Sequence, residues 1–298
     1  MENSMNFFLE RYEQLGETLA PPIELRQSLR VNTLKITDAV LIQRLSALGV
    51  SLEKIPFTRH GYYCSSNFSL GAITEFLLGY FYLQEAAAQV PVELLDLNKE
   101  DIVLDMCAAP GGKTTQIAQV MQNKGTVIAI EKKRHRLISL KSSLERMGVS
   151  NTAAYLFDAN DARFLGIEFD KVLLDAPCSG NFVTDRNWFN KKSFEGIQRM
   201  AEMQKSLIKS ALSVLKKDGI LVYSTCSLEP EENELNMEWM LKHFKVVIEK
   251  TNLKIGSEGL TKVFGRKLDP YIANCRRFWP NKTKTEGFFI ARIRKLYD

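Results

Sequence analysis

The chain has 298 residues and a net charge of +5, with 45% hydrophobic and 25% charged residues. This length allows a large buried core and predicts two domains. No apolar run is long enough to cross a bilayer, and residues 1–10 lack the basic-then-apolar pattern of a secretion signal, so a membrane protein is not expected.

Residues 1–95 are predicted to form a smaller first domain. The patterns indicate a helix over 7–15, a strand over 29–34, a helix that follows the N-cap residue Thr37, and a second strand over 50–57. Basic residues are scattered along this domain, at Arg26, Arg30, Lys35, Lys54 and Arg59. They are compatible with an RNA-contacting module or with a solvated surface, and composition alone favours the solvated surface.

Residues 96–298 are predicted to form an α/β domain. Strand-like apolar runs lie at 102–106, 126–130, 153–157, 172–175, 220–224, 244–248 and 288–293, and helical patterns separate the earlier ones. This alternation predicts a parallel sheet with helices on both faces. A long irregular segment joins the last two runs, so we expect the final strand to be antiparallel. Pro230 with its acidic neighbours predicts the start of a further helix.

The strand at 102–106 leads into a tight turn and then a helix. The turn consists of Cys107, Ala108, Ala109, Pro110, Gly111, Gly112 and Lys113. This order presents backbone N–H groups and a helix N-terminus to a ligand, and the small side chains would let a flat ligand lie against the main chain. The glycine spacing matches neither the dinucleotide nor the phosphate-loop pattern. Taken alone, the turn is as compatible with a simple connection as with a binding loop.

Acidic residues follow the next two strands. Glu131 stands where an acid can accept hydrogen bonds from two ribose hydroxyls, and Asp158 stands where one can accept from an adenine amino group. Either acid alone is more often a helix cap. Combined with the glycine turn, the two predict a nucleoside ligand with no phosphate requirement.

Five cysteines occur, an odd number, without any C-x-x-C pair, and the three histidines do not have metal-ligand spacing. We therefore expect reduced thiols, a cytoplasmic location, and neither a disulfide scaffold nor a metal site. Cys178 and Cys226 each lie in a turn just after a strand of the predicted sheet. A free cysteine is usually a small core residue, but two at one sheet edge indicate nucleophilic chemistry.

Three motifs contain these residues: 105–113 (DMCAAPGGK), 175–180 (DAPCSG) and 223–234 (YSTCSLEPEENE). In this order they resemble the motifs of the Sun/Fmu-type RNA cytosine-C5 methyltransferases. Residues 30–35 and 79–85 resemble the N-terminal region of that family, and 277–280 with 287–289 resemble its C-terminal end. The resemblance covers nearly the whole chain. It implies a seven-stranded Rossmann-like sheet with an antiparallel last strand, beside a smaller α+β RNA-binding domain.

The resemblance also implies S-adenosylmethionine as cofactor and assigns site residues. Those implied to bind the cofactor are Cys107, Ala108, Ala109, Pro110, Gly111, Gly112, Lys113, Glu131, Arg136, Asp158 and Asp175. Those implied to be catalytic are Cys226 as nucleophile, Cys178 as second cysteine, and Asp175 near the target base. Two stretches depart from the usual family pattern, Asn281 and residues 181–188.

The implied reaction is methylation of cytosine C5 in RNA, through a bond between Cys226 and C6 and without a metal. Thiolate addition at C6 makes C5 nucleophilic, and a base must later remove the C5 proton. The expected substrate is tRNA, because the chain is compact, and rRNA is the alternative. A non-catalytic RNA-binding assembly factor on the same fold is the alternative from another class. A monomer is expected, and an accessory protein stays open.

Overall fold

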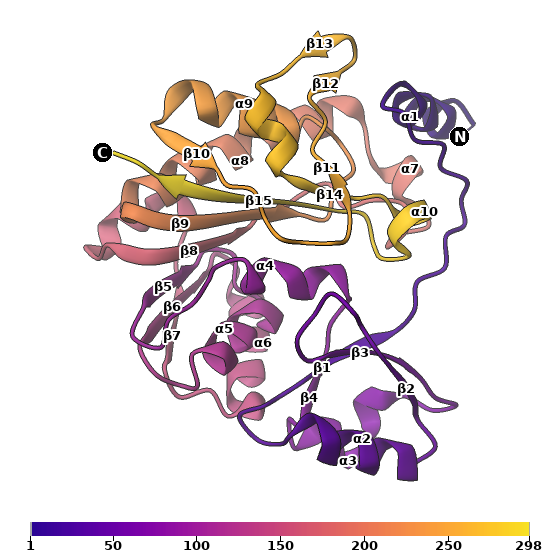
Figure 1. Ribbon diagram of the computed structural model, residues 1–298, viewed down its shortest axis with the longest axis vertical. Coiled ribbons are helices and arrows are strands. Elements are labelled where there is room, and N and C mark those ends of the chain that lie inside the picture. The colour runs from indigo at the N-terminus through magenta and orange to yellow at the C-terminus, as the bar shows by residue number, and fades with distance from the viewer. Residues whose placement is uncertain (1, 298) are drawn as a thin grey trace.

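The computed structural model describes residues 2–297 and shows a small sheet below a larger one in the view of Figure 1. The small sheet is antiparallel, with strand order β2-β3-β1-β4. Its part of the chain contains β1 (Ser28–Val31), α2 (Asp38–Ala47), β2 (Ser51–Lys54), β3 (Gly61–Ser65), η1 (Leu70–Ala72), α3 (Thr74–Leu77) and β4 (Phe81–Leu83). The predicted N-cap is confirmed, since the Thr37 hydroxyl accepts a hydrogen bond from the N–H of Val40.

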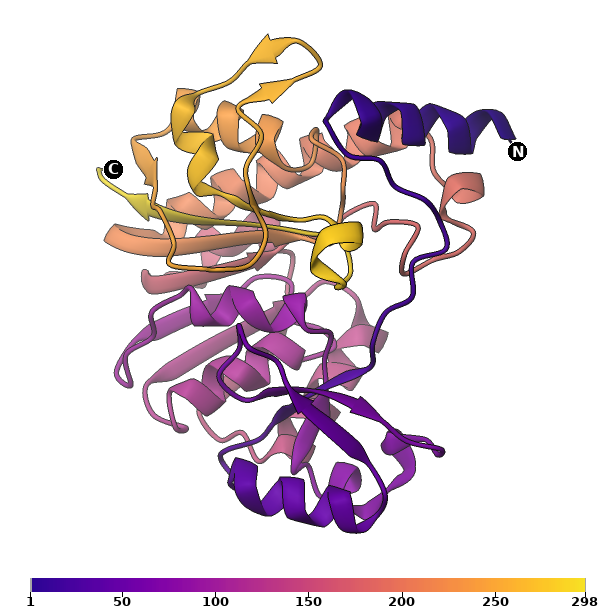
Figure 2. The same cartoon turned by 45° about the vertical axis from the view of Figure 1, so that its right-hand side comes forward.

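Helix α1 (Glu2–Gln14) does not pack on the small sheet, although both belong to the first 95 residues. The Phe8 ring lies 4.7 Å from the Trp188 ring, and the Tyr12 hydroxyl donates a 2.6 Å hydrogen bond to Oε1 of Glu229. Figures 1 and 2 both show α1 beside the large part of the molecule, with an extended segment leading to the small sheet. The first helix is therefore part of the core of the larger unit.

The large part holds a nine-stranded sheet with order β11-β14-β15-β9-β8-β5-β6-β7, and β10 also pairs with β15. Its strands are β5 (Ile102–Asp105), β6 (Thr126–Glu131), β7 (Thr152–Leu156), β8 (Phe169–Asp175), β9 (Leu215–Thr225), β10 (Val246–Ile248), β11 (Ser257–Glu258), β14 (Arg276–Phe278) and β15 (Phe288–Lys295). Strands β5 to β9 are mutually parallel, whereas β15 is antiparallel to β9. The predicted parallel sheet with an antiparallel last strand is confirmed.

The sheet has two strands more than the seven predicted. Both come from the segment that was predicted to be irregular. The eight-residue β15 has room for two partners in a row: Phe288–Ile290 pairs with β14, and Ile293–Lys295 pairs with β10. Strand β11 then pairs with β14. Strands of two or three residues have no readable alternation, so only the long-range pairing reveals them.

Helices cover both faces of this sheet and join its strands. They are η2 (Ala87–Gln89), α4 (Val90–Glu93), α5 (Gly112–Val120), α6 (Arg134–Met147), η3 (Ala159–Leu165), α7 (Trp188–Lys191), α8 (Phe194–Val214), α9 (Glu234–His243), η4 (Pro270–Asn274) and α10 (Pro280–Thr283). A two-stranded ribbon, β12 (Lys262–Val263) with β13 (Arg266–Lys267), completes the described residues. None of the helices within 2–297 combines the length and apolarity needed to cross a membrane.

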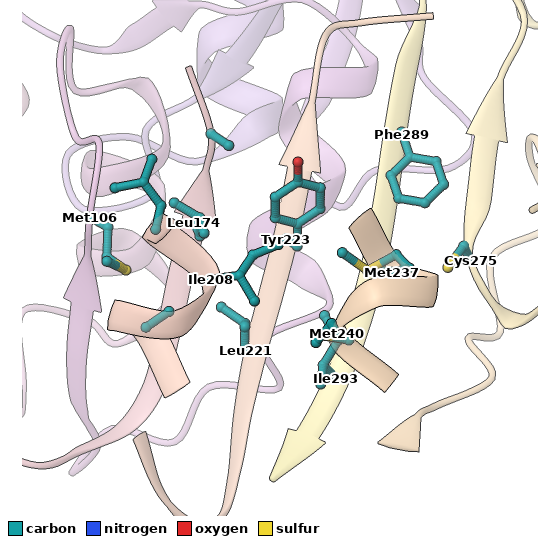
Figure 3. Packing of buried hydrophobic residues seen from close by; sticks show 14 of the residues in the cluster. Met106, Leu174, Ile208, Leu221, Tyr223, Met237, Met240, Cys275, Phe289 and Ile293 are labelled. Carbon is teal, nitrogen blue, oxygen red and sulfur yellow. The ribbon is translucent and has the colours of Figure 1, made fainter. Parts of the chain in front are cut away.

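The main core lies between the sheet and the helices α8 and α9. Figure 3 shows the side chains that meet there, including Leu174, Ile208, Leu221, Tyr223, Met237, Met240 and Phe289. The apolar face of α8 is buried over much of its 21 residues. This packing holds strands β8 and β9 rigidly side by side, and the polar groups at their ends are therefore fixed with respect to each other.

One predicted helix start was wrong. Helix α9 begins at Glu234, and Pro230 lies in the turn that precedes it. The acids before the helix do not serve its positive end. The Glu229 carboxylate accepts a hydrogen bond from Tyr12, and the Glu232 carboxylate accepts hydrogen bonds from two buried serines. Both side chains therefore bind groups outside the helix instead of its first amides.

Arg30, one of the basic residues considered as an RNA contact, is buried, and so is Arg277 near the C-terminal end of the sequence. Arg30 is 1% exposed and donates to the backbone oxygen of Gly112 and to the hydroxyl of Thr115, so it joins the small sheet to α5. Arg277 is fully buried and pairs with Glu234. Neither guanidinium can reach a phosphate, and both hold the fold together.

Candidate active site

Polar side chains gather at the carboxyl edge of the large sheet. Asp105 ends β5, Glu131 ends β6, Asp175 ends β8, and Cys226 directly follows β9. These four strands are neighbours in the order β9-β8-β5-β6 and run parallel, so their ends lie along one edge. The structure thus brings the predicted site residues of four strands together.

The glycine turn lies tightly against helix α6. Gly111 has φ +110° and precedes the first residue of α5, and a Cβ at this position would come within 2.9 Å of the Ser143 Cβ. A side chain here would be strained in conformation and in space. The turn is tied to β6 by a hydrogen bond from the N–H of Ala108 to the oxygen of Ile130. The first amides of α5 have no acceptor within their own helix and point out of its N-terminal end.

Asp105 has one oxygen that is paired and one that is not. Its Oδ2 accepts a 2.7 Å hydrogen bond from the Thr114 hydroxyl, and its buried Oδ1 has no partner among the described residues. Burial raises the pKa of Asp105 to about 7. A buried carboxyl oxygen without a donor is costly, and it marks a place where a ligand with an N–H or O–H group would be stabilised.

Glu131 and Arg136 form one cluster with the turn. Glu131 accepts a 2.8 Å hydrogen bond from the N–H of Lys133, and its other oxygen lies 3.3 Å from the guanidinium of Arg136. Arg136 also donates to the oxygen of Ala109 at 2.6 Å. The arginine therefore links the acid at the end of β6 to the glycine turn.

Asp158 lies after β7 and is already partnered. It caps η3 by accepting from the N–H of Asn160, and it pairs with Lys132 at 2.6 Å. The Lys132 hydrogen bond lowers the pKa of the Asp158 carboxyl, which keeps it ionised. The capping role that an acid at this position usually has is present, and contact with an adenine stays a prediction.

Lys113 and Asp175 form an ion pair in the centre of the edge. The Nζ of Lys113 lies 2.7 Å from Oδ2 of Asp175, and the hydroxyl of Ser224 donates to Oδ1 at 2.7 Å. Burial lowers the pKa of Lys113, but the Asp175 carboxylate outweighs it, so the pKa is raised overall. The lysine is held as a cation beside β8 and β9. Ser224 was visible in the sequence only as one polar residue of a strand end.

The two cysteines of the predicted chemistry are in contact. Their sulfur atoms lie 2.9 Å apart, and both are free thiols. The carbonyl of Cys226 accepts a 2.7 Å hydrogen bond from the amide of Asn181, which also donates to Gly287. Asn181 belongs to the stretch that departs from the usual family pattern, and its role here was not visible from the sequence.

Cys226 is a thiol in the free protein. The hydrogen bond with Cys178, followed by burial and the Asp175 charge, raises the pKa of Cys226 well above its usual value. Lys113 acts in the opposite direction. Formation of a thiolate therefore requires a change in this pair, such as loss of the Cys178 hydrogen bond or arrival of a proton acceptor.

The small domain also contributes an acid to this region. Glu85, at the end of the matched stretch 79–85, accepts hydrogen bonds from the N–H groups of Ala87 and Glu286. Burial raises the pKa of Glu85, and burial followed by the Glu85 charge raises that of Glu286 well above its usual value. Within residues 2–297, no group of three or more His, Cys, Asp or Glu side chains is placed to hold a metal ion.

Comparison with known proteins gives two family matches that share the chain. Residues 92–294 match the family model of 16S rRNA methyltransferase RsmB/F. Residues 2–86 match that of the N-terminal domain of 16S rRNA methyltransferase RsmF. The first match alone covers more than half of the chain and includes every predicted site residue.

Two curated relatives and one solved structure define the similarity further. The chain is 39% identical over 277 residues to a 28S rRNA (cytosine-C(5))-methyltransferase of Mus musculus, covering 90% of this chain and 35% of the relative. It is 39% identical over 230 residues to a tRNA (cytosine(72)-C(5))-methyltransferase of Pyrococcus horikoshii, covering 77% and 56%. The chain thus spans about half the length of these relatives, or less.

The solved structure is that of NSun6 from Pyrococcus horikoshii with SFG. It aligns with a TM-score of 0.83 and 29% identity, and the alignment covers 100% of this chain and 97% of that one. The similarity therefore includes the small sheet as well as the large one. The prediction of a Rossmann-like methyltransferase sheet beside a smaller domain is confirmed.

Proposed function

The chain belongs to the RsmB/F methyltransferase family, and on this premise we propose that it methylates C5 of cytosine in RNA with S-adenosylmethionine. The observation that carries the proposal is the contact between Cys178 and Cys226, at 2.9 Å, beside the Lys113–Asp175 ion pair. One nucleophilic thiol, a second thiol and a fixed charge pair are what addition to a cytosine ring and release from it require.

The residues of the sheet edge fit the cofactor. S-adenosylmethionine, when bound, supplies an electrophilic methyl group. The unpaired oxygen of Asp105 and the outward amides of the α5 N-terminus offer acceptor and donor groups for its amino-acid part. Glu131, held by Arg136, offers a carboxylate to ribose hydroxyls, and Asp158 lies next along the edge. The turn from Cys107 to Lys113 provides a surface with little side-chain bulk.

Cys226 starts the reaction by adding to C6 of the target cytosine. The sulfur forms a bond to C6, and the electrons of the C5–C6 double bond move toward N3, where the thiol proton finally resides. The Lys113 cation next to Asp175 stabilises the negative charge that develops on the ring, and Asp175 with Ser224 holds the lysine in place. C5 becomes nucleophilic as a result. A target base inside a helix would be flipped out of its stack first.

Cys178 completes the reaction. After methylation, C5 carries both a hydrogen and the new methyl group. Cys178 first gives its own proton to solvent, and its thiolate, in contact with Cys226, accepts the C5 proton. The C6–S bond breaks with its electron pair returning to Cys226, and the N3 proton passes back to that sulfur. The double bond of the ring is restored and the product leaves.

We propose tRNA as the substrate and keep rRNA as the second candidate. The Pyrococcus relative is named for tRNA, and the mouse relative and both family models are named for rRNA. We propose a cytoplasmic location, with which the five free thiols accord. A monomer is proposed as well, and an accessory protein stays open. A non-catalytic assembly factor would have no need of the cysteine pair.

Methyl transfer to total RNA tests the proposal. The purified protein is incubated with total tRNA, with rRNA and with labelled S-adenosylmethionine, and modified cytosines are mapped. Labelled 5-methylcytosine in tRNA supports the full proposal, and labelling of rRNA alone transfers it to the second candidate. RNA binding without methyl transfer to either would indicate the assembly factor.

A further inference from the structure

A buried carboxylate links the turns that carry the two cysteines. Glu232 lies in the turn before α9 and is fully buried. Its Oε1 accepts from the hydroxyls of Ser179 and Ser227, the second bond being 2.7 Å long. Its Oε2 accepts from the N–H of Ser179 at 3.0 Å and from the amide of Gln204 at 2.8 Å. One side chain thus receives four hydrogen bonds.

Each of the two serines that bind Glu232 is the neighbour of one of the two cysteines. Ser179 directly follows Cys178, and Ser227 directly follows Cys226. The same Gln204 amide that contacts Glu232 also donates to the oxygen of Pro177, the residue before Cys178, at 2.8 Å. The hydroxyls of Ser179 and Ser227 lie 3.1 Å apart. Both cysteine turns are therefore fastened at one point, one residue away from each sulfur.

The charge of this group suggests more than a stabilising role. Among the described residues no lysine, arginine or histidine forms an ion pair with Glu232, and burial raises the pKa of its carboxyl. A buried acid that is held by neutral donors alone is costly for the fold. Nearby Glu229, by contrast, is paired with Arg11.

We propose that Glu232 is a positioning residue, which fastens the Cys178 turn to the Cys226 turn and so keeps Cys178 within reach of C5 for product release. This inference rests on the proposed function. The step it serves is the breaking of the C5–H bond, with the proton passing to the thiolate sulfur of Cys178, and of the C6–S bond, with the electrons returning to Cys226. Addition of Cys226 to C6 does not require the two cysteine turns to be fixed relative to each other.

The test compares adduct with released product in single-turnover reactions with RNA and S-adenosylmethionine, separated on denaturing gels. Glu232→Ala leaves four donors without their acceptor, and the Cys178 turn shifts. The adduct-to-product ratio should rise on the order of tenfold, because small displacements of a reacting group have large effects on rate. Glu232→Gln can rescue the ratio, since its oxygen can accept from the Ser179 N–H and Gln204 while its NH₂ donates to the two hydroxyls.

The matched control is Glu231→Ala, one residue away. The Glu231 side chain is 13% exposed and pairs with Arg11, and among the described residues no hydrogen bond or ion pair joins it to either cysteine turn. The adduct-to-product ratio of the Glu231→Ala variant should equal that of the unchanged protein. A Glu232→Ala variant that loses adduct and product equally, or a Glu231→Ala variant with the same raised ratio, would overturn the positioning role. Ser227→Ala removes one of the four bonds, and it decides the question by the same ratio if Glu232→Ala does not fold.

Two further variants separate this inference from the proposed function. Cys178→Ala should accumulate adduct, and Cys178→Ala/Glu232→Ala should accumulate no more than Cys178→Ala, because the acid acts through that cysteine. An additional change in the double variant would show that Glu232 acts elsewhere and would overturn the inference. Absence of adduct in Cys178→Ala contradicts the proposed function itself. Adduct in Cys178→Ala but not in Glu232→Ala overturns the positioning role alone.

Discussion

The ammonium group of Lys113 lies 2.7 Å from the carboxylate of Asp175 and so connects the glycine turn after β5 to the end of β8. The lysine belongs to the turn predicted to bind the cofactor, and the aspartate ends the neighbouring strand β8, beside the cysteine pair. This ion pair is the point at which the predicted cofactor region and the predicted catalytic region meet.

Replacing Lys113 should affect addition of Cys226 strongly. Lys113→Met keeps much of the side-chain volume and removes the cation that we propose to stabilise charge on the ring. The rate of adduct formation should fall about 10²–10³-fold, the cost of losing one preorganised charge-stabilising group. Rapid-quench kinetics with a Cys178→Ala background, in which the adduct accumulates, gives this rate. An unchanged rate would remove Lys113 from the chemistry.

Replacing Glu131 should weaken cofactor binding without RNA. Glu131→Ala removes the carboxylate that we propose for the ribose hydroxyls, and affinity should fall by about 1–3 kcal/mol, the scale of charge-assisted hydrogen bonds. Calorimetry with S-adenosylmethionine measures it. Glu145→Ala, on the exposed side of α6, is the control and should bind as the unchanged protein does. Equal affinities in the two variants would show that Glu131 lies outside the cofactor site.

Most strands of the large sheet were readable from the sequence, because they are apolar runs separated by helices of clear period. Two short strands, β11 and β14, were not, since only the pairing of β14 with β15 and of β11 with β14 defines them. The start of α9 was also not readable from the sequence, because it depends on contacts with other elements. Acids beside a proline usually open a helix, but here buried partners on other elements bind them.

The reactivity of Cys226 should depend on Cys178 and on pH. A thiol reacts as its thiolate, so below the pKa its alkylation rate rises about tenfold per pH unit. The Cys178 hydrogen bond is the largest cause of the raised pKa of Cys226. Its removal in Cys178→Ala lowers that pKa and enlarges the thiolate fraction at any given pH below it. Iodoacetamide labelling between pH 7 and 9, read by peptide mass spectrometry, should therefore be faster at Cys226 in this variant.

Buried Cys275 serves as the internal reference in that experiment, since it should stay unlabelled in both proteins while they are folded. Slower or equal labelling of Cys226 in Cys178→Ala would show that the contact between the sulfur atoms does not control the thiol.

Binding of RNA should weaken steeply as salt rises, because phosphate contacts release counterions. Arg59→Ala removes an exposed cation of the small domain and should reduce the salt slope by about one. Lys216→Ala, at the opposite edge of the large sheet from the cysteines, is the control and should leave the slope unchanged. Filter binding at several salt concentrations checks both. Salt-insensitive binding would contradict an electrostatic RNA contact.

The sequence motifs identified the cysteines, the glycine turn and the acids of the site, since each stands directly after a strand. They did not reveal the groups that hold those residues in place. Ser224 on Asp175, Asn181 on the carbonyl of Cys226, and Glu232 on Ser179 all act between residues that are far apart in the sequence. Such contacts depend on how the elements pack, and neither periodicity nor local spacing encodes them.

The most direct test of the mechanism is a denaturing gel of the two cysteine variants after incubation with cytosine-containing RNA and S-adenosylmethionine. Cys226→Ala should form neither 5-methylcytosine nor a covalent complex, because no bond to C6 can form. Cys178→Ala should accumulate a denaturant-resistant complex, and the double variant should form none. A complex in Cys226→Ala but not in Cys178→Ala would reverse the roles of the two cysteines and contradict the account.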